Sequence, residues 1–516
     1  MSISSRYEKI IFYTAILFFL TLLYGQLLPH YQLIHGDDFF ITLPLSKIHS
    51  PFEYLTALVN FQLIDIQPVR DLSYFFDMWL IPYCGFRIFL ITNLVIWFLS
   101  IIQLKKLLLR FNNSNVFCSL FALIMAIYPT FSWVISSASS RKHLLSFLFG
   151  LLFINLIFEE RNNKNYIKMI VTFILSVFSN PITVIIWIPS LIYDIVYGNK
   201  DAKNLRKFYF IIIFLSALVF ILNYYYYNTL VPSQSDGAQT LQNWDINLTI
   251  MALGRFFFQI LAPIHFSSYY NQVNLENFIG LLGLAFVLFT FYFISSKKEF
   301  IFILSLYFCN LLIPLLRVSH NLISDSYLLL PFVAYLIIIL KIFSLIQHKL
   351  KKSSYIILSI GLIACFYKTN FEIHFWTDPT LLTRISFTRE KNCRNLQPYF
   401  MNLILNDNLL EVNQNSGVLF DSCPKMFGPT LFSILIYTLD GTTNEKLKKL
   451  HLIDNISASL VSELIKLENN EPNNFENTMK ESKLKITSGF RNIFFIFIDN
   501  RRKSLCRQRK VECDQI

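Results

Sequence analysis

The first apolar run of the chain, Ile10–Leu28, reads IIFYTAILFFLTLLYGQLL and carries no charged side chain. A helix of this length is long enough to cross the ~30 Å hydrocarbon core of a bilayer. No cleavage site of small residues follows it, so the run is interpreted as a membrane helix rather than a cleaved signal peptide. It therefore predicts that the chain enters a membrane close to its N-terminus.

Similar apolar runs recur along most of the chain. They lie near residues 86–104, 115–135, 143–158, 166–178, 181–197, 207–225, 277–295, 300–316, 327–346 and 354–367. With the first run they predict a polytopic α-helical membrane protein with about eleven transmembrane helices. Composition agrees, because 54% of the 516 residues are hydrophobic and only 15% are charged, whereas soluble domains are about 25% charged.

The net charge of +12 does not indicate nucleic-acid binding, because the basic residues fall largely in short loops between apolar runs. Such loops are typical of the cytoplasmic side, and their positions predict a cytoplasmic N-terminus. An odd number of crossings then places the tail, from about Thr369, on the opposite side. Richness in Ile, Asn, Lys and Phe suggests an AT-rich genome. We therefore expect a bacterial inner membrane with a periplasmic tail, the endoplasmic reticulum being the alternative.

Two domains are expected. Residues 1–368 form the transmembrane domain, whose first exported loop, 29–85, includes an amphipathic helix over Leu72–Leu80 that lies on the membrane. Residues 369–516 form a small non-cytoplasmic α/β domain. Its expected elements are a helix over 388–411 and strands at Gly417–Phe420 and Asn492–Phe497.

Two adjacent acids, Asp37 and Asp38, follow Gly36 just beyond the first predicted helix. Carboxylates next to a bilayer are costly to keep unless they have a function. Two close carboxylates raise each other's proton affinity, and one can take a proton from an acceptor hydroxyl. We interpret the pair as candidate catalytic residues. The alternative is that they cap a juxtamembrane helix or face water.

Positive residues on the predicted non-cytoplasmic side run against the usual distribution of basic residues. Guanidinium groups bind phosphate oxygens in a bidentate manner, so a phosphate ligand at the membrane surface gives these residues a common role. The predicted phosphate-binding residues are Arg70, Arg141, Lys142 and Arg317, with Arg255, His143, Asp325 and Tyr327 as further candidates. The alternative is that each arginine pairs with a lipid head group or a nearby aspartate.

A carboxylate base beside phosphate-binding cations suits sugar transfer from a lipid-phosphate carrier. The base activates the acceptor hydroxyl, and the cations stabilise the departing phosphate. The sequence has no Gly-rich nucleotide loop, which disfavours a nucleotide-sugar donor and ATP-driven transport. No metal-ligand spacing of Cys and His occurs, and the participation of a divalent metal stays open.

Five stretches along the chain resemble, in order, the motifs of a known family. They are Gly36–Phe39, Gln67–Asp77, Trp133–Ser136 followed by Ser140–Ser146, Ser324–Pro331, and Trp376–Leu382. The first is similar to an acidic first-loop motif and the second to Arg-Pro-x-x-x-Leu-Ser-x-x-x-Asp. The third is similar to a Trp…Ser…Arg-Lys…Leu-Ser turn. In these features the chain resembles GT-C-type membrane glycosyltransferases, in particular bacterial relatives of the transmembrane-and-TPR O-mannosyltransferases.

The resemblance implies an inverting glycosyltransferase. Its donor would be a polyprenyl-phosphate-linked sugar, its acceptor a surface glycan, lipid or protein, and its base Asp37 or Asp38. The chain departs from the family at Gln67 and Ser326, where the family has arginines, and its tail shows no TPR repeats. A polysaccharide polymerase, a lipid-linked glycan transporter and a catalytically inactive scaffold are the alternative functions.

Overall fold

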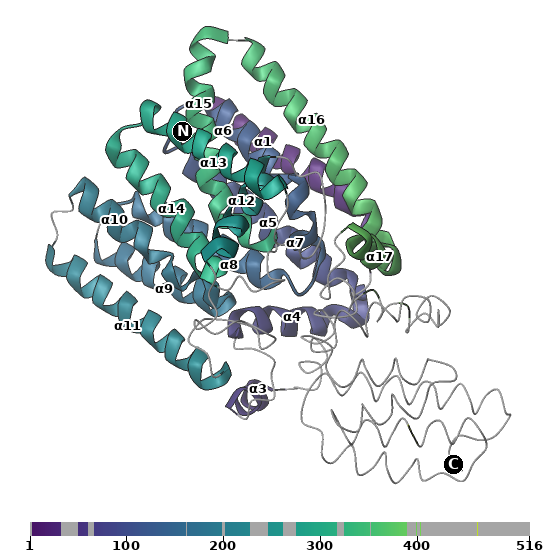
Figure 1. Cartoon of the computed structure of the whole chain (residues 1–516). Coiled ribbons are helices and arrows are strands. Elements are labelled where there is room, and N and C mark those ends of the chain that lie inside the picture. Colours follow the sequence, from purple (N-terminus) through teal and green to yellow (C-terminus); the bar gives the residue numbers. More distant parts are fainter. Residues whose placement is uncertain are drawn as a thin grey trace. The chain divides into compact units, whose positions relative to one another are not determined.

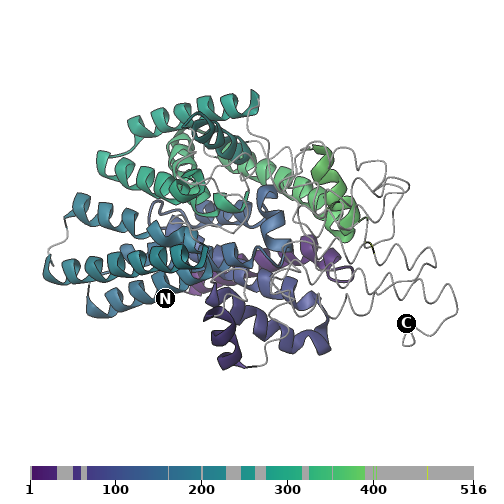
Figure 2. The ribbon, with the colours of Figure 1, turned by 60° about the horizontal axis from the view of Figure 1, so that its bottom comes forward.

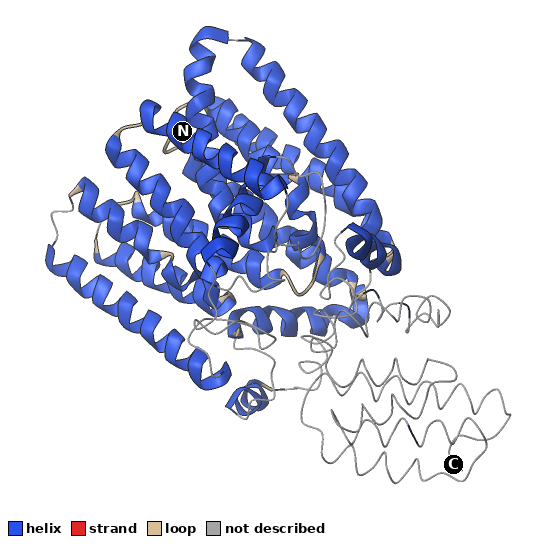
Figure 3. Ribbon diagram, in the orientation of Figure 1, coloured by secondary structure: helices blue, strands red, loops and turns tan. Residues whose placement is uncertain are grey.

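The computed structural model describes residues 3–31, 50–59, 67–160, 162–198, 202–227, 246–261, 275–316, 325–350 and 352–389, with the single residues 399, 403 and 462. These residues are almost all helical and contain no strand (Figures 1 and 3). Several of the helices are long and apolar enough to span a bilayer. The chain is therefore a helical integral membrane protein, as its sequence predicts.

Seven helices in the described part of the chain meet the length and composition that a membrane span requires. All seven coincide with predicted apolar runs. They are α1 (Ile3–Tyr24, continued by η1, Gly25–Leu27), α5 (Arg87–Leu108), α11 (Ala202–Tyr227), α13 (Leu275–Ile294), α14 (Lys297–Leu316), α15 (Leu329–Leu350, preceded by η5, Asp325–Leu328) and α16 (Lys352–His374, continued by η6, Phe375–Thr377).

The predicted count of eleven is not confirmed, because the remaining apolar runs form shorter helices. These are α8 (Arg141–Ile157), α9 (Asn163–Ser179) and α10 (Trp187–Tyr197, preceded by η3, Pro181–Ile185). A further short apolar helix, α12 (Ile246–Leu261), lies outside the eleven predicted runs. Helices α8 and α9 have 17 residues each, which corresponds to about 26 Å at 1.5 Å per residue, less than the ~30 Å hydrocarbon core. Figures 1 and 2 show α9 and α11 side by side, and the two helices are in contact.

An eighth span results if α6 (Asn115–Ala126) and the segment of η2 (Pro129–Phe131) and α7 (Ser132–Ser136) are counted together. The two parts are bent by 46°. Proline has no N–H to donate and disfavours a helical conformation in the residue before it, which explains a break at Pro129. The break frees the carbonyl of Ile127, which accepts a hydrogen bond of 2.5 Å from the Thr369 hydroxyl of α16.

Helix α4 (Pro68–Cys84) occupies the second half of the predicted first loop and contacts α5, α8 and α9 (Figure 1). The predicted helix over Leu72–Leu80 lies within it and is confirmed as a helix. One face of α4 is apolar and exposed, and it carries Leu72, Phe76, Trp79 and Tyr83. The opposite face is buried and polar. This helix ends at Gly85, whose φ of 63° is a conformation that favours glycine.

The chain divides into two compact units. The first consists of Met1–Ile34 and Asp65–Asn392, and the second of His35–Ile64 and Cys393–Ile516. The predicted domain boundary after residue 368 falls inside α16, and the first unit continues through α17 (Pro379–Arg389). The apolar run ends near residue 367, but the helix continues.

The second unit is described mainly at α3 (Pro51–Val59). The predicted strands of the tail, and nearly all of its predicted helix over 388–411, lie outside the described residues. The α/β character of the tail therefore stays a prediction.

Candidate functional site

Arg141, at the start of α8, is the centre of a buried polar cluster. Its Nη2 lies 2.5 Å from Asp77 Oδ2 of α4, and neither side chain is exposed. The guanidinium also donates to Asn93 Oδ1 and to the Phe89 carbonyl of α5, both at 2.9 Å. The second Asp77 oxygen accepts from the Thr92 hydroxyl at 2.6 Å. This cluster ties α4, α5 and α8 together at one end of the helices.

Arg70 forms a second buried cluster at the start of α4. Its guanidinium donates to Asp71 Oδ1 at 2.6 and 2.8 Å and to Gln67 Oε1 at 2.8 Å. Gln67, where the family has an arginine, is thus the N-cap residue of α4 and a partner of Arg70. Arg70 and Arg141, two of the three predicted phosphate-binding arginines, therefore both have carboxylate partners within the protein.

The short turn between α7 and α8, residues 137–140, brings together stretches that are far apart in sequence. The Tyr74 hydroxyl of α4 donates to the Ala138 carbonyl at 2.5 Å, and Tyr31 donates to the Ser136 carbonyl at 2.9 Å. Trp133 of α7 packs on Trp376 of η6 with ring centroids 4.7 Å apart. We call this region, with the first turns of α4 and α8, the α7–α8 junction.

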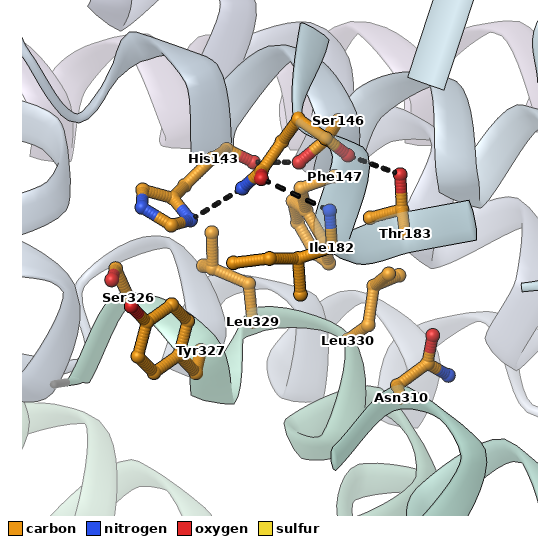
Figure 4. Close-up of a pocket in the computed structure, with 11 residues that line it drawn as sticks. His143, Ser146, Phe147, Ile182, Thr183, Asn310, Ser326, Tyr327, Leu329 and Leu330 are labelled. Atoms are coloured by element: carbon orange, nitrogen blue, oxygen red, sulfur yellow. Dashed lines mark hydrogen bonds between the residues drawn. The ribbon is translucent and has the colours of Figure 1, made fainter. Parts of the chain in front are cut away.

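His143 and Tyr327 extend the junction to η5, their rings meeting edge to face at 5.7 Å (Figure 4). Asn180 Oδ1 accepts from the Ile182 N–H at 3.3 Å, so its Nδ2 faces His143 Nδ1 at 3.0 Å. Because an amide nitrogen only donates, Nδ1 is the acceptor in this contact. His143 and Tyr327 were both predicted candidates, and the structure brings them together.

The pocket lined by these side chains is small, and its lining mixes polar and apolar residues (Figure 4). Its volume of about 30 Å³ is enough for about two or three water molecules, which need roughly 10–15 Å³ each by this measure. Ser146, Thr183 and Asn310 also line it. The pocket is too small for a sugar.

A larger, mostly apolar cavity lies between α6, α12, α15 and α16. Its volume is about 610 Å³, and Lys368 is the charged residue among those lining it. Lys368 Nζ donates to Glu372 Oε1 at 2.6 Å, one turn further along α16, and the Glu372 carboxylate is buried. The cavity begins at the break between α6 and α7, since Tyr128 and Pro129 line it.

The other predicted residues are dispersed or lie outside the described part of the chain. Arg255 of α12 is buried and pairs with Glu276 of α13. Lys142 is half-buried beside Arg141, and Asp325 begins η5. The predicted bases Asp37 and Asp38, and the predicted phosphate ligand Arg317, lie outside the described residues. Within the described ranges, no three His, Cys, Asp or Glu side chains are placed to hold a metal ion.

Sequence analysis missed Lys368, Glu372 and Asn180. Lys368 and Glu372 do have a signal in the sequence. They are two charged residues, four positions apart, that directly follow the last apolar run on the predicted non-cytoplasmic side, where positive residues are unusual. Asn180 has no comparable signal, since its role depends on the approach of α8 to η3.

Comparison with known proteins adds no relative: no protein-family model, curated protein or solved structure matches this chain. The resemblance to GT-C-type glycosyltransferases therefore stays a prediction.

Proposed function

We propose that the chain is a membrane glycosyltransferase that moves a sugar from a polyprenyl-phosphate-linked donor to a hydroxyl of a glycan, lipid or protein acceptor. The observation that supports it most is the convergence at the α7–α8 junction. Four of the five stretches that carry the family resemblance meet there, through Arg141–Asp77, His143–Tyr327 and Trp133–Trp376. Ionisable residues gathered at one end of membrane helices are costly to keep and mark functional sites.

In the proposed reaction, Asp37 or Asp38 takes the proton of the acceptor hydroxyl. The acceptor oxygen forms a bond to the anomeric carbon, the bond from that carbon to the phosphate oxygen breaks, and polyprenyl phosphate leaves with the electron pair. The configuration at the anomeric carbon is inverted. Tyr31, which contacts the junction, precedes Asp37 by six positions in the sequence.

The phosphate-binding role of Arg70 and Arg141 has a specific requirement. A donor phosphate would have to displace Asp71 from Arg70, or Asp77 from Arg141. Removing a partner from a buried ion pair costs about 3–5 kcal/mol. We therefore propose that these arginines mainly position α4 against the junction.

The test is a transfer assay with the purified full-length protein, a polyprenyl-phosphate-linked sugar and a panel of hydroxyl acceptors. Release of polyprenyl phosphate coupled to acceptor modification is expected for the wild type. Asp37→Asn or Asp38→Asn, at the residue that is the base, should lower the rate by roughly 10²–10⁴. Wild-type rates in both variants would remove the catalytic assignment.

A lipid-linked glycan transporter is the second candidate, because the break between α6 and α7 is a feature of transporter binding sites. Reconstitution into liposomes separates the two functions. A transporter moves the labelled glycan lipid between leaflets and leaves the sugar–phosphate bond intact. A transferase breaks that bond when an acceptor is present.

A further inference from the structure

The apolar cavity between α6, α12, α15 and α16 offers a binding site that the sequence did not reveal. We infer that it holds the prenyl chain of the lipid donor, and that Lys368 binds the donor phosphate in competition with Glu372. The inference rests on the proposed function and specifies where that donor binds.

The walls of the cavity suit a hydrocarbon chain. Phe121, Tyr128, Phe332, Leu336 and Leu358 are among the lining residues, and its volume of about 610 Å³ lies within the roughly 300–1,000 Å³ of small-molecule pockets. Helices α15 and α16 are candidate spans, so the cavity lies at the depth of lipid chains. An apolar chain that enters the cavity from the surrounding lipid exchanges one apolar environment for another and leaves no polar group of its own unpaired.

Lys368 provides the charge complementarity. The charged groups of a lipid phosphate are anionic oxygens, and an ammonium has three N–H donors for them. One of these donors faces Glu372 at 2.6 Å, and the Lys368 side chain retains 29% exposure whereas Glu372 retains 1%. A phosphate that reaches Lys368 therefore meets a partly accessible cation whose charge is already balanced by a buried carboxylate.

The position of Lys368 connects the cavity to the α7–α8 junction. Thr369 contacts Ile127 at the end of α6, and Trp376 of η6, which continues α16, packs on Trp133 of α7. The Lys368 ammonium points along α16 toward the Trp376 end, where Glu372 lies. A donor with its phosphate at Lys368 thus has its sugar directed toward the junction and its chain in the cavity.

Gly361 gives the sharpest variant, because it lines the cavity and a Cβ atom placed there meets no heavy atom within 4 Å. Gly361→Phe should place its ring in the cavity, and replacing a glycine inside a helix does not weaken the helix. Ile360→Phe is the matched control, since Ile360 is 61% exposed and is not a lining residue. Binding of a polyprenyl monophosphate to the full-length protein in nanodiscs should weaken more than tenfold in Gly361→Phe and be unchanged in Ile360→Phe.

Two charge variants test the head-group contact in opposite directions. Lys368→Met should weaken polyprenyl monophosphate binding by roughly 10- to 100-fold, the worth of a charge-assisted hydrogen bond. It should leave binding of the uncharged polyprenol unchanged. Glu372→Gln removes the competing carboxylate, so polyprenyl monophosphate should bind severalfold more tightly. A purely structural ion pair would instead make both variants less stable and move binding in the same direction.

The source of the phosphate is distinguished by competition with phosphatidylglycerol vesicles. Displacement of polyprenyl monophosphate by equimolar phosphatidylglycerol would show a general phospholipid site and overturn the inference. Unchanged binding in both Gly361→Phe and Lys368→Met, with sugar transfer still lost in the Asp37 and Asp38 variants, would also overturn it while the proposed function stands. If wild-type protein neither binds the monophosphate nor transfers sugar, both fail.

Discussion

The buried pair of Arg141 and Asp77 gives the prediction that separates structural from ligand-binding arginines. In Arg141→Met the Asp77 carboxylate keeps its hydrogen bond from Thr92 but loses the guanidinium at 2.5 Å, and Asn93 loses its donor. Since both charged side chains are fully buried, the free energy of unfolding should fall by about 3–5 kcal/mol. Asp77→Leu should cost a similar amount, because it leaves the Arg141 charge uncompensated.

The double variant Asp77→Leu/Arg141→Met removes both charges and fills the site with apolar groups. Buried ion pairs replaced in this way often lose little stability, so the double variant should lose much less than the roughly 6–10 kcal/mol to which the two single changes sum. Unfolding is measured in one detergent mixture for all variants. Lys106→Met is the control, because the Lys106–Glu159 pair is exposed and such pairs contribute at most about 1 kcal/mol.

Suppose that the free energy of unfolding of Arg141→Met lies within about 1 kcal/mol of the wild-type value, but that this variant binds polyprenyl monophosphate much more weakly. Arg141 is then a phosphate ligand, and the structural role assigned to it is wrong. If the stability losses of the two single variants simply add up in the double variant, the two side chains do not stabilise each other.

Three further predictions concern other contacts. Asn180→Leu removes the amide nitrogen that faces His143 Nδ1 and should lower the free energy of unfolding by about 1–3 kcal/mol, as thermal unfolding will show. Thr369→Val leaves the Ile127 carbonyl without its hydroxyl donor and should lower stability by about 1–3 kcal/mol, while Thr369→Ser should not, as thermal unfolding will show. A spin label at Trp79→Cys, on the exposed face of α4, should be accessible to oxygen and protected from an aqueous relaxant; aqueous exposure would contradict an interfacial position.

The fold class could be predicted from the sequence because charge-free runs have few alternatives in a chain of this composition. Each of the eleven predicted runs coincides with at least one helix. The number of spans could not be predicted, since α8 and α9, at 17 residues, are marginal in length and hydropathy does not register the break at Pro129. Periodicity also gave no indication that α16 continues beyond residue 367.

The candidate site could be predicted only in its residue types. His143 and Tyr327 were singled out separately and meet in space. The partners of Arg70 and Arg141 could not be identified from spacing alone, because Asp77 reaches Arg141 through the packing of α4 on α5 and α8. Lys368 could not be recognised from apolar runs alone, because its importance depends on a cavity formed by four helices distant in sequence.

The most direct test of the central claim is a surface-glycan profile of the source organism. A strain lacking the chain is complemented with the wild type or with Asp37→Asn/Asp38→Asn, and expression of both proteins is matched. The glycosyltransferase account predicts that a sugar lost in the deletion returns with the wild type and not with the double variant. Return of that sugar with both proteins would contradict the account, because the acidic pair would then not be catalytic and the chain would act by binding or transport.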